Sequence, residues 1–340
     1  MKTFRSQFVA SKPILAGCLG LTFMLALSGC SAVQVKLGLR TPLAKIPVAS
    51  MAASLPNNPA IAPGEKSPMI VEVTGTDGKV WLTEGKGKGK ILWKDLAVNA
   101  SVVAANKKGV LSLPKDPRVS DGKTGHVVVT APSHPGIQTE LDIPLRYDYK
   151  FTANFSGTSG FPGSNGIDGT DGISGTPGSL DPNNPSAGGN GSNGGNGTDG
   201  SDGGNGSDAP PVQVVATLRP GAHPLLQMSV SATGNRKVKF FLVDPQGGSL
   251  TVNATGGAGG SGGKGGRAGR GGSGGIGSPN GSNGSDGSAG RDGSDGQPGR
   301  GGSITVTYDP QVTPYLTAIH LNNDGGPKPV FQQQPVAPLW

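Results

Sequence analysis

Cysteine, aromatic residues and charge are all scarce in this chain. Its 340 residues include two cysteines, Cys18 and Cys30, and both lie near the N-terminus. Aromatic residues make up 5% of the sequence and charged residues 15%. Between residues 68 and 155 the sequence also shows no helical periodicity. These absences argue against a helical domain in that region and against a single enzyme core that fills the chain.

Glycine, by contrast, is abundant and unevenly spread. The chain has 61 glycines in 340 residues, which is about 18% against an average near 7%. Most of them lie in two stretches, 157–208 and 257–302, and the rest of the chain has ordinary glycine usage. The sequence is therefore an ordinary one that is interrupted by two Gly-rich inserts.

The N-terminus predicts export and lipidation. Lys2, Arg5 and Lys12 form a basic segment before an apolar run from Pro13 to Leu27. That run is too short for a confident membrane span and is typical of a secretory signal peptide. It ends in Leu27-Ser28-Gly29-Cys30, which resembles the lipobox of bacterial lipoproteins. The resemblance implies cleavage before Cys30 and lipidation of that residue, with diacylglycerol on its thiol and palmitate as an expected acyl chain.

A second lipobox-like match and a plain signal peptide are the alternatives. Leu15-Ala16-Gly17-Cys18 has almost no apolar run before it, so Cys30 is the preferred position. In a plain signal peptide, Cys30 would be a chance residue. Ser31 follows the cysteine. In Gram-negative lipoproteins an Asp at that position often means inner-membrane retention, so the resemblance implies an outer-membrane lipoprotein of the cell envelope, periplasmic or surface-exposed.

The mature chain offers little for thiol or nucleic-acid chemistry. With Cys18 removed and Cys30 lipidated, no thiol remains for a disulfide, a thiolate metal site or a nucleophile. Of 29 cationic and 22 anionic residues, three cations lie in the signal peptide, which leaves 26 minus 22, or +4. This modest charge predicts no nucleic-acid partner. The expected partners are the membrane, through the lipid, and extracellular matrix, a glycan or a second copy of the chain.

Alternating patterns outside the inserts predict a mainly β fold. Runs separated by Gly and Pro predict eight short strands, at 69–74, 79–83, 91–93, 96–104, 110–113, 126–131, 137–145 and 147–155. This spacing favours an antiparallel β-sandwich of immunoglobulin-like size. We expect Trp81 and Trp93 to anchor its core, and a ligand platform is the alternative for them. The predicted organisation is signal peptide 1–29, lipidated Pro/Ala-rich tether 30–67, sandwich 68–156, first insert 157–208, strands 209–255, second insert 256–302, closing strands 303–321 and a loose tail 322–340.

Within the inserts, glycine recurs at every third residue. The repeat runs through four arms, 157–178, 188–208, 257–277 and 281–302, and a Pro/Asn turn signal separates the arms of each pair. Polyproline-II geometry has three residues per turn, so glycine lines one edge that other backbones can approach closely. The repeat resembles the collagen-like repeats of bacterial surface proteins. The departures are few prolines and several extra glycines, as in Gly194-Gly195 and Gly265-Gly266.

These departures leave three interpretations of the inserts open. The arms can fold back as antiparallel hairpins of polyglycine-II helices within one chain, form a collagen-like homotrimer, or remain disordered loops. The placement favours hairpins, because a hairpin returns the chain to its start and lets a sheet continue. Six aspartates and no cations lie in the first insert, whereas five cations lie in the second. Hairpins packed side by side would therefore place opposite charges together.

Candidate binding residues are few, and no catalytic set emerges. The segments at 194–199 and 203–208 begin like the nonapeptide calcium repeat, which makes Asp199, Asp202 and Asp208 candidate calcium ligands. The large apolar residue of that repeat is missing, because Ser201 and Pro210 take its place. A basic loop is a candidate polyanion contact or a solvated hairpin loop; its residues are Lys86, Lys88, Lys90 and Lys94. We expect no catalytic residues, no metal site and no cofactor besides the lipid.

The expected function is that of a non-enzymatic cell-surface lipoprotein. Its β-domains would support a collagen-like, Gly-rich projection with a structural or adhesive role. The alternative is a surface lipoprotein that binds a ligand, glycan or calcium. A hydrolase is disfavoured, because the sequence lacks the set of His, Asp and nucleophile that such an enzyme needs. Ice binding is a more remote alternative.

Overall fold

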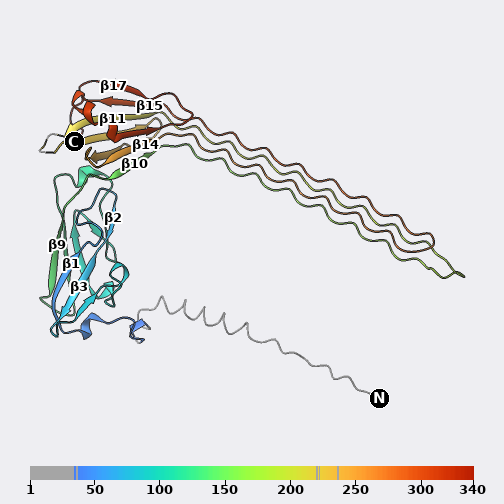
Figure 1. The fold of residues 1–340 in the computed structure, drawn as a ribbon, viewed down its shortest axis with the longest axis horizontal. Helices are drawn as coiled ribbons and strands as arrows, with labels where there is room; N and C mark the ends of the chain where they lie inside the picture. The colour runs from blue at the N-terminus through green and yellow to red at the C-terminus, as the bar shows by residue number, and fades with distance from the viewer. Residues whose placement is uncertain (1–33, 36, 220, 222, 236) are drawn as a thin grey trace, which may run out of the picture. The chain divides into compact units, whose positions relative to one another are not determined.

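A computed structural model of the protein describes residues 34–340 apart from 36, 220, 222 and 236. The chain divides into two compact units, unit 1 up to Arg146 and unit 2 from Tyr147 to Trp340 (Figure 1). Both are built mainly of β-strands, which confirms the predicted fold class. The predicted signal peptide and Cys30 lie outside the described residues.

Unit 1 is built from three antiparallel three-stranded sheets, with strand orders β1-β3-β4, β2-β7-β6 and β5-β8-β9. Its strands are β1 (Val48–Ser54), β2 (Lys66–Pro68), β3 (Ile70–Gly75), β4 (Val80–Leu82), β5 (Ala97–Ser101), β6 (Ala104–Ala105), β7 (Val110–Ser112), β8 (Gly125–Thr130) and β9 (Gln138–Ile143). Short 3-10 helices join them: η1 (Leu43–Lys45), η2 (Gly85–Gly87), η3 (Trp93–Asp95) and η4 (Pro117–Val119).

The core of unit 1 follows the alternation of its strands. In β8 every second residue is buried, so one face of the strand turns to the core and the other does not. Trp93 is part of this core and is 5% exposed, and Trp81 packs against it half-buried. Both tryptophans therefore have the predicted packing role. Asp77-Gly78 forms the turn of a hairpin between β3 and β4, and Gly78 has the positive φ of 76° that such a turn requires.

Unit 1 begins well before the predicted sandwich boundary at residue 68. Within the segment predicted as tether, 30–67, the structure contains η1, β1 and β2. Leu43 and Ile61 are fully buried in the core, and β1 pairs with β3 along its length. The prediction of a tether to residue 67 is wrong. The Ala and Pro content of this segment hid a strand whose apolar residues are mostly small.

Unit 2 has two sheets, with strand orders β10-β14-β16 and β13-β12-β11-β15-β17. Its elements are β10 (Lys150–Asn154), β11 (Val212–Arg219), β12 (Leu225–Ala232), β13 (Lys239–Val243), β14 (Ser249–Asn253), β15 (Ile304–Tyr308), the 3-10 helix η5 (Pro310–Ala318), β16 (Ile319–Asn322) and β17 (Val330–Gln333). Phe151 of β10 packs against Phe241 of β13, with 6.1 Å between ring centroids. The predicted first domain, 68–156, therefore ends too late, because β10 belongs to unit 2.

Two parallel strand pairs in unit 2 lead into the inserts. β10 pairs with β14 and β11 pairs with β15, both parallel, where the sequence favoured antiparallel pairing. The physical reason is that each insert leaves from one strand and returns to another: the first runs from β10 to β11, and the second from β14 to β15. Strands that enter the inserts therefore lie together, as do strands that leave them (Figure 1).

The C-terminal segment is ordered, whereas the sequence predicted a loose tail from 322 to 340. β17 pairs with β15. Beyond it, Gln227, which is 2% exposed, holds the end of the chain: its Oε1 accepts from Leu339 N at 3.1 Å, and its Nε2 donates to Trp340 O at 3.4 Å. The Trp340 ring packs edge-on against Phe240. A buried amide thus finds its partners in a segment that looked too polar to fold.

Candidate functional site

The two inserts form one bundle of four extended arms. We call them arm A (157–178), arm B (188–208), arm C (257–277) and arm D (281–302). Arms A and B form one antiparallel hairpin and arms C and D another, as the hairpin interpretation predicted. Between the hairpins, arm A runs parallel to arm C and arm B parallel to arm D, and arms B and C also bond to each other. Figure 1 shows the arms side by side over their length.

Backbone hydrogen bonds between arms recur every third residue. In arm A, Gly160 N–H donates to Ala258 O at 2.8 Å, and Gly163 N–H donates to Ser261 O at 2.7 Å. The same period links the other arms, for example Gly263 N–H to Ser201 O at 2.9 Å. This is the pattern expected of packed polyglycine-II helices, in which the backbone bonds go to neighbours. The bundle is therefore held by its main chain and has no hydrophobic core.

Close backbone approach explains why glycine occupies the repeating position. A Cβ atom added to Gly203 would overlap the carbonyl oxygen of Gly260. A Cβ added to the next residue, Gly204, would lie 3.2 Å from Phe161 N and meet no closer atom. The first glycine faces the neighbouring arms, whereas the second lies on the surface. In this pair glycine is therefore a steric requirement at the first position and a tolerated small residue at the second, whereas in arm C both glycines of a pair, such as Gly265 and Gly266, face neighbouring backbones.

Asparagine and aspartate side chains add a second set of bonds. Along arm B they accept hydrogen bonds from the backbone N–H groups of arm D, at 2.6–2.9 Å; the acceptors are Asn190, Asn193, Asn196, Asp199, Asp202, Asn205 and Asp208. Asp168 does the same for Arg267 N of arm C at 2.7 Å. These side-chain oxygens accept from backbone N–H groups that make no backbone hydrogen bond to a neighbouring arm.

Aspartates of one hairpin lie beside arginines of the other, as predicted, but they do not pair with the arginine side chains. Aspartates of the first insert do lie beside cations of the second, since Asp168 bonds to Arg267 and Asp199 to Arg291. The bonded group is the backbone N–H of each arginine. No ion pair between the inserts is present in the part of the chain that the structure describes. The backbone N–H of each arginine bonds to the aspartate, and the guanidinium group at the end of the long side chain does not pair with it.

One side of the bundle, formed by arms A and B, has no charged residue. We call it the neutral face. Its arm A row consists of Thr158, Phe161, Ser164, Ile167, Thr170, Ile173, Thr176 and Ser179. Its arm B row consists of Ser186, Gly189, Ser192, Gly195, Thr198, Ser201, Gly204 and Ser207. The two rows are joined because the backbone groups of the first row bond to those of the second, as in Gly204 N to Phe161 O at 2.8 Å.

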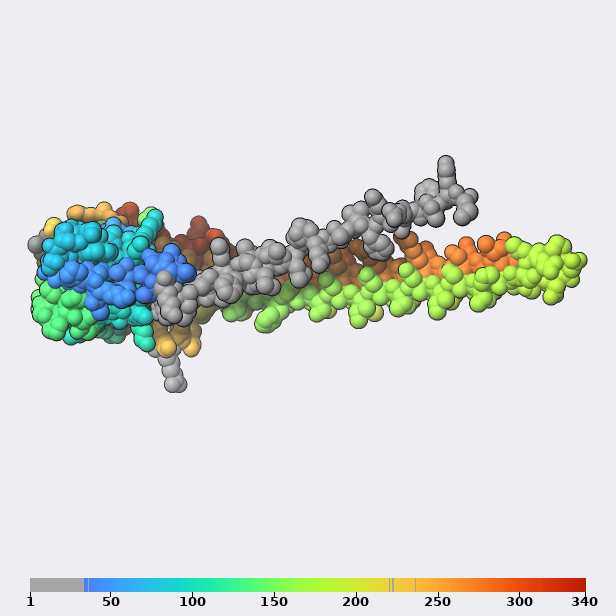
Figure 2. Space-filling model, turned by 90° about the horizontal axis from the view of Figure 1, so that it is seen from below, coloured from blue at the N-terminus to red at the C-terminus, as the bar shows by residue number. Residues whose placement is uncertain are grey.

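Three large apolar side chains stand out from the neutral face. Phe161 is 85% exposed, Ile167 74% and Ile173 79%, and they recur at every sixth residue with Ser or Thr between them. Hydroxyl groups fix the backbone beneath them: Ile167 N donates to Thr198 Oγ1 and Ile173 N donates to Ser192 Oγ, each at 2.7 Å. Figure 2 shows side chains projecting at regular intervals along the first insert. Such a row of exposed apolar groups favours an interaction surface.

The candidate calcium ligands lie in one row along arm B, with Asn205 between Asp202 and Asp208. Asp199, Asp202 and Asp208 each accept a backbone N–H from arm D, from Arg291, Ser294 and Arg300 respectively. The structure does not bring the three carboxylates to one point. Among the residues described, no group of three or more His, Cys, Asp or Glu gathers as metal ligands would.

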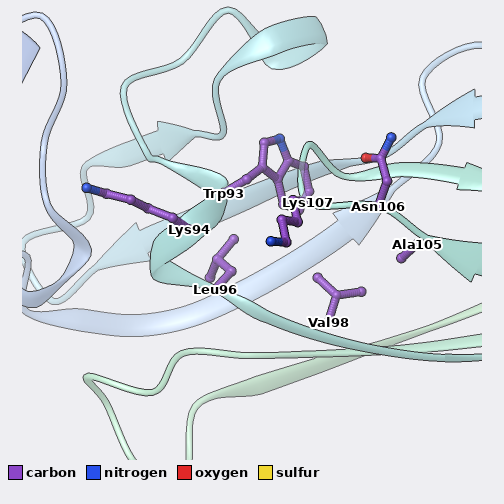
Figure 3. A pocket seen from close by; sticks show the side chains of 7 residues that line it. All are labelled: Trp93, Lys94, Leu96, Val98, Ala105, Asn106 and Lys107. Atoms are coloured by element: carbon purple, nitrogen blue, oxygen red, sulfur yellow. The ribbon is translucent and has the colours of Figure 1, made fainter. Parts of the chain in front are cut away.

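The candidate polyanion contact lies in unit 1. Lys86 is in η2, Lys88 follows it with a left-handed backbone (φ 52°), and Lys90 Nζ donates to Gly38 O at 3.3 Å. Lys94 lines a pocket of about 260 Å³ (Figure 3). Apolar side chains and two further polar residues line the pocket with it: Trp93, Leu96, Val98, Ala105, Asn106 and Lys107. Of the four predicted lysines, Lys94 alone lines this pocket, and Lys107 lines it as well.

Comparison with known proteins supplies no relative. No family, curated protein or solved structure matches this chain. In the described residues, no helix has the length and hydropathy needed to cross a bilayer. The site must therefore be argued from its own geometry.

Sequence reasoning missed the neutral face. Its two rows are 7 to 49 residues apart along the chain where side-chain bonds join them. The signal was present in arm A, where every Gly is followed by Thr, Phe, Ser or Ile. The matching row on arm B can be identified only when arm B is aligned antiparallel to arm A in the correct register.

Proposed function

We propose that this protein is a non-enzymatic, lipid-anchored protein of the cell surface, whose glycine bundle is a projection with a structural or adhesive role. The observation that carries this proposal is the bonding of all four arms into one unit. Disordered inserts would have no fixed surface to present. A bonded bundle, on the order of 65 Å long at about 3.1 Å per residue, holds its side chains in a constant order far from its supporting strands.

The arrangement supports presentation more than catalysis. Most side chains on the bundle are short polar groups, and many of their oxygens accept hydrogen bonds from neighbouring arms. The exposed apolar groups of the neutral face are bound to a rigid backbone, so an interaction there orders little additional chain. Lipid at Cys30 would hold the protein at the outer membrane, and the bundle would contact matrix, glycan or another bundle.

The anchor is tested by metabolic labelling with tritiated palmitate. We expect label in the full chain and in Cys18→Ser, and none in Cys30→Ser. Label that survives Cys30→Ser would contradict the proposed anchor. Fractionation of the same cells should move Cys30→Ser from the membrane to a soluble fraction.

The projection is tested by shortening it without disturbing its register. Removing three triplets from each of the four arms keeps every inter-arm bond in phase. We expect normal surface display and a loss of cell-to-cell or matrix adhesion. Adhesion that is unchanged by this shortening would contradict the proposed role. Glycan binding that persists would instead favour the alternative site in unit 1, where Lys94 and Lys107 border an apolar pocket.

A further inference from the structure

We propose that the neutral face binds the neutral face of a second copy of this chain, with the two bundles parallel. The parallel direction follows from the complementary sizes of the two rows of that face, and its relevance at the membrane rests on the proposed function, because two chains anchored in one membrane project the same way. The pairing itself rests on the face alone. Three properties of that face identify a second copy as the partner: its repeat, its shape and its area.

The repeat length selects a partner that has the same repeat. Phe161, Ile167 and Ile173 recur at every sixth residue, which is about 19 Å along a polyglycine-II helix. A partner that meets all three side chains must present receptive positions with this spacing over the whole arm. A second bundle meets this requirement automatically, because its arms are locked to the same period.

The two rows of the neutral face are complementary to each other in size. A twofold axis along the bundle would place the arm A row of one copy over the arm B row of the other. Residues that neighbour each other within one chain would then face each other between chains. Phe161 would face Gly204, Ile167 would face Thr198, and Ile173 would face Ser192. Each large side chain thus meets a small one, and the arm B row contains only Gly, Ser and Thr.

The area of the neutral face suffices for a specific interface. Two neighbouring arms are about 10 Å wide if they are spaced like strands. With a length on the order of 65 Å, each copy offers about 650 Å², and pairing buries about 1,300 Å² in total. This lies at the lower end of the range for specific interfaces, about 1,200–2,000 Å². A micromolar Kd is therefore the expectation.

Charge also favours pairing through the neutral face over pairing through the other sides of the bundle. Arm C carries Lys264, Arg267 and Arg270, and arms B and D carry aspartates and arginines along their outer rows. Pairing through those sides would place like charges together or remove charged groups from water. The neutral face has neither cost, because its polar side chains are hydroxyls, several of which already bond within the face.

Sedimentation of a lipid-free chain tests the proposal. The chain begins at Ser31 and keeps every residue that the structure describes. We expect a monomer–dimer equilibrium, and we expect the triple variant Phe161→Ser, Ile167→Ser, Ile173→Ser to weaken it at least about 100-fold. A chain that stays monomeric at about 100 µM would overturn the proposal. So would a triple variant that dimerises like the parent.

A matched control separates this face from general stickiness. Ile276 is 64% exposed on arm C, outside the neutral face, and Ile173 is 79% exposed within it. Ile276→Ser should leave the Kd unchanged, whereas Ile173→Ser should raise it several-fold. Equal effects would contradict a defined face. Circular dichroism of each variant should match that of the parent, because these side chains make no bond within the bundle.

Cysteine cross-linking tests the direction of pairing. The chain from Ser31 has no cysteine. Mixing Ile167→Cys chains with Thr198→Cys chains should give a disulfide-linked dimer, since these positions face each other in the parallel arrangement. A link between Ile167→Cys and Thr170→Cys chains, with none between 167 and 198, would overturn it in favour of antiparallel pairing. These measurements need neither anchor nor adhesion, so they fail independently of the proposed function.

Discussion

The β-sheets of unit 1 and the glycine bundle of unit 2 are stabilised in opposite ways. Unit 1 buries large apolar side chains such as Leu43, Ile61 and Leu111, all 0% exposed. The bundle leaves Phe161 85% exposed and gains its order from main-chain bonds. In the first region side chains exclude water from the backbone. In the second, the lack of side chains lets backbones approach each other.

The comparison teaches where each region is vulnerable. A sandwich loses stability when a buried side chain becomes smaller, because a cavity remains. The bundle should lose stability when a side chain becomes larger, because backbone atoms occupy the space. Four predictions test this contrast, from the largest effect to the smallest.

Truncation in the sandwich core should have the largest effect. Leu111 is fully buried in unit 1. Leu111→Ala should reduce the free energy of unfolding of unit 1 by about 2–5 kcal/mol. Denaturant melts monitored by tryptophan fluorescence would measure it. Val119→Ala, at a residue that is 52% exposed, is the control and should change stability by less than about 0.5 kcal/mol. A bundle signal that melts with Leu111→Ala would show that the regions are not independent.

Enlargement at an inner glycine of the bundle should come next. Gly203→Ala places a methyl group against the carbonyl of Gly260 and should cost about 1–3 kcal/mol. The adjacent change, Gly204→Ala, meets Phe161 N at 3.2 Å and should cost less than about 0.5 kcal/mol. Melting of the polyproline-II dichroism signal measures both. Equal effects of the two neighbours would contradict the packing described here.

Removal of a side-chain acceptor should have a smaller effect on the bundle. Asp199 Oδ1 accepts from Arg291 N at 2.7 Å. Asp199→Ala leaves that donor to water and should cost about 0.5–1.5 kcal/mol. Asp199→Asn keeps an acceptor oxygen and should retain most of the stability. If Asn is as harmful as Ala, the carboxylate acts by charge and the bonding account fails for this residue.

An ion pair of unit 1 should give the smallest effect. The hydrogen bond from Arg118 lowers the pKa of Asp116 below its usual value. A lowered folded-state pKa adds stability above the unfolded pKa of about 3.9, and this stability is lost as pH falls through the folded pKa. Asp116→Asn should therefore cost a few tenths of a kcal/mol at pH 7. Melts at pH 7 and pH 2 measure it, and a difference that persists at pH 2 would contradict this origin.

Much of the bundle was predictable because its rule is local. Gly at every third residue and the Pro/Asn turns that divide each insert alone predict four arms. The expected return to the same sheet is wrong, because β10 and β14 lie in one sheet and β11 and β15 in the other. The register between arms was not predictable. It depends on how β10 pairs with β14 and β11 with β15, since those parallel pairs continue into arms A and C and arms B and D.

The missed parts share a physical cause. β1 is rich in Ala and Ser, so its pairing with β3 and burial at Val48 and Met51 decide its structure. The C-terminal segment is polar, and the buried amide of Gln227 orders it from a distance in sequence. In the bundle, the aspartates were expected to meet cationic side chains, yet they bond backbone amides. In each case the deciding partner lies on another element.

Amide hydrogen exchange followed by NMR would test the central claim most directly. In arm A, the N–H groups of Gly166 and Ile167 are bonded, to Lys264 O and Thr198 Oγ1, each at 2.7 Å. The N–H of Asp168 has no partner among the described residues. We predict slow exchange at Gly166 and Ile167 and fast exchange at Asp168, with the protection of the glycine N–H repeated in steps of three along the arm. Uniformly fast exchange across residues 157–208 and 257–302 would contradict a folded bundle.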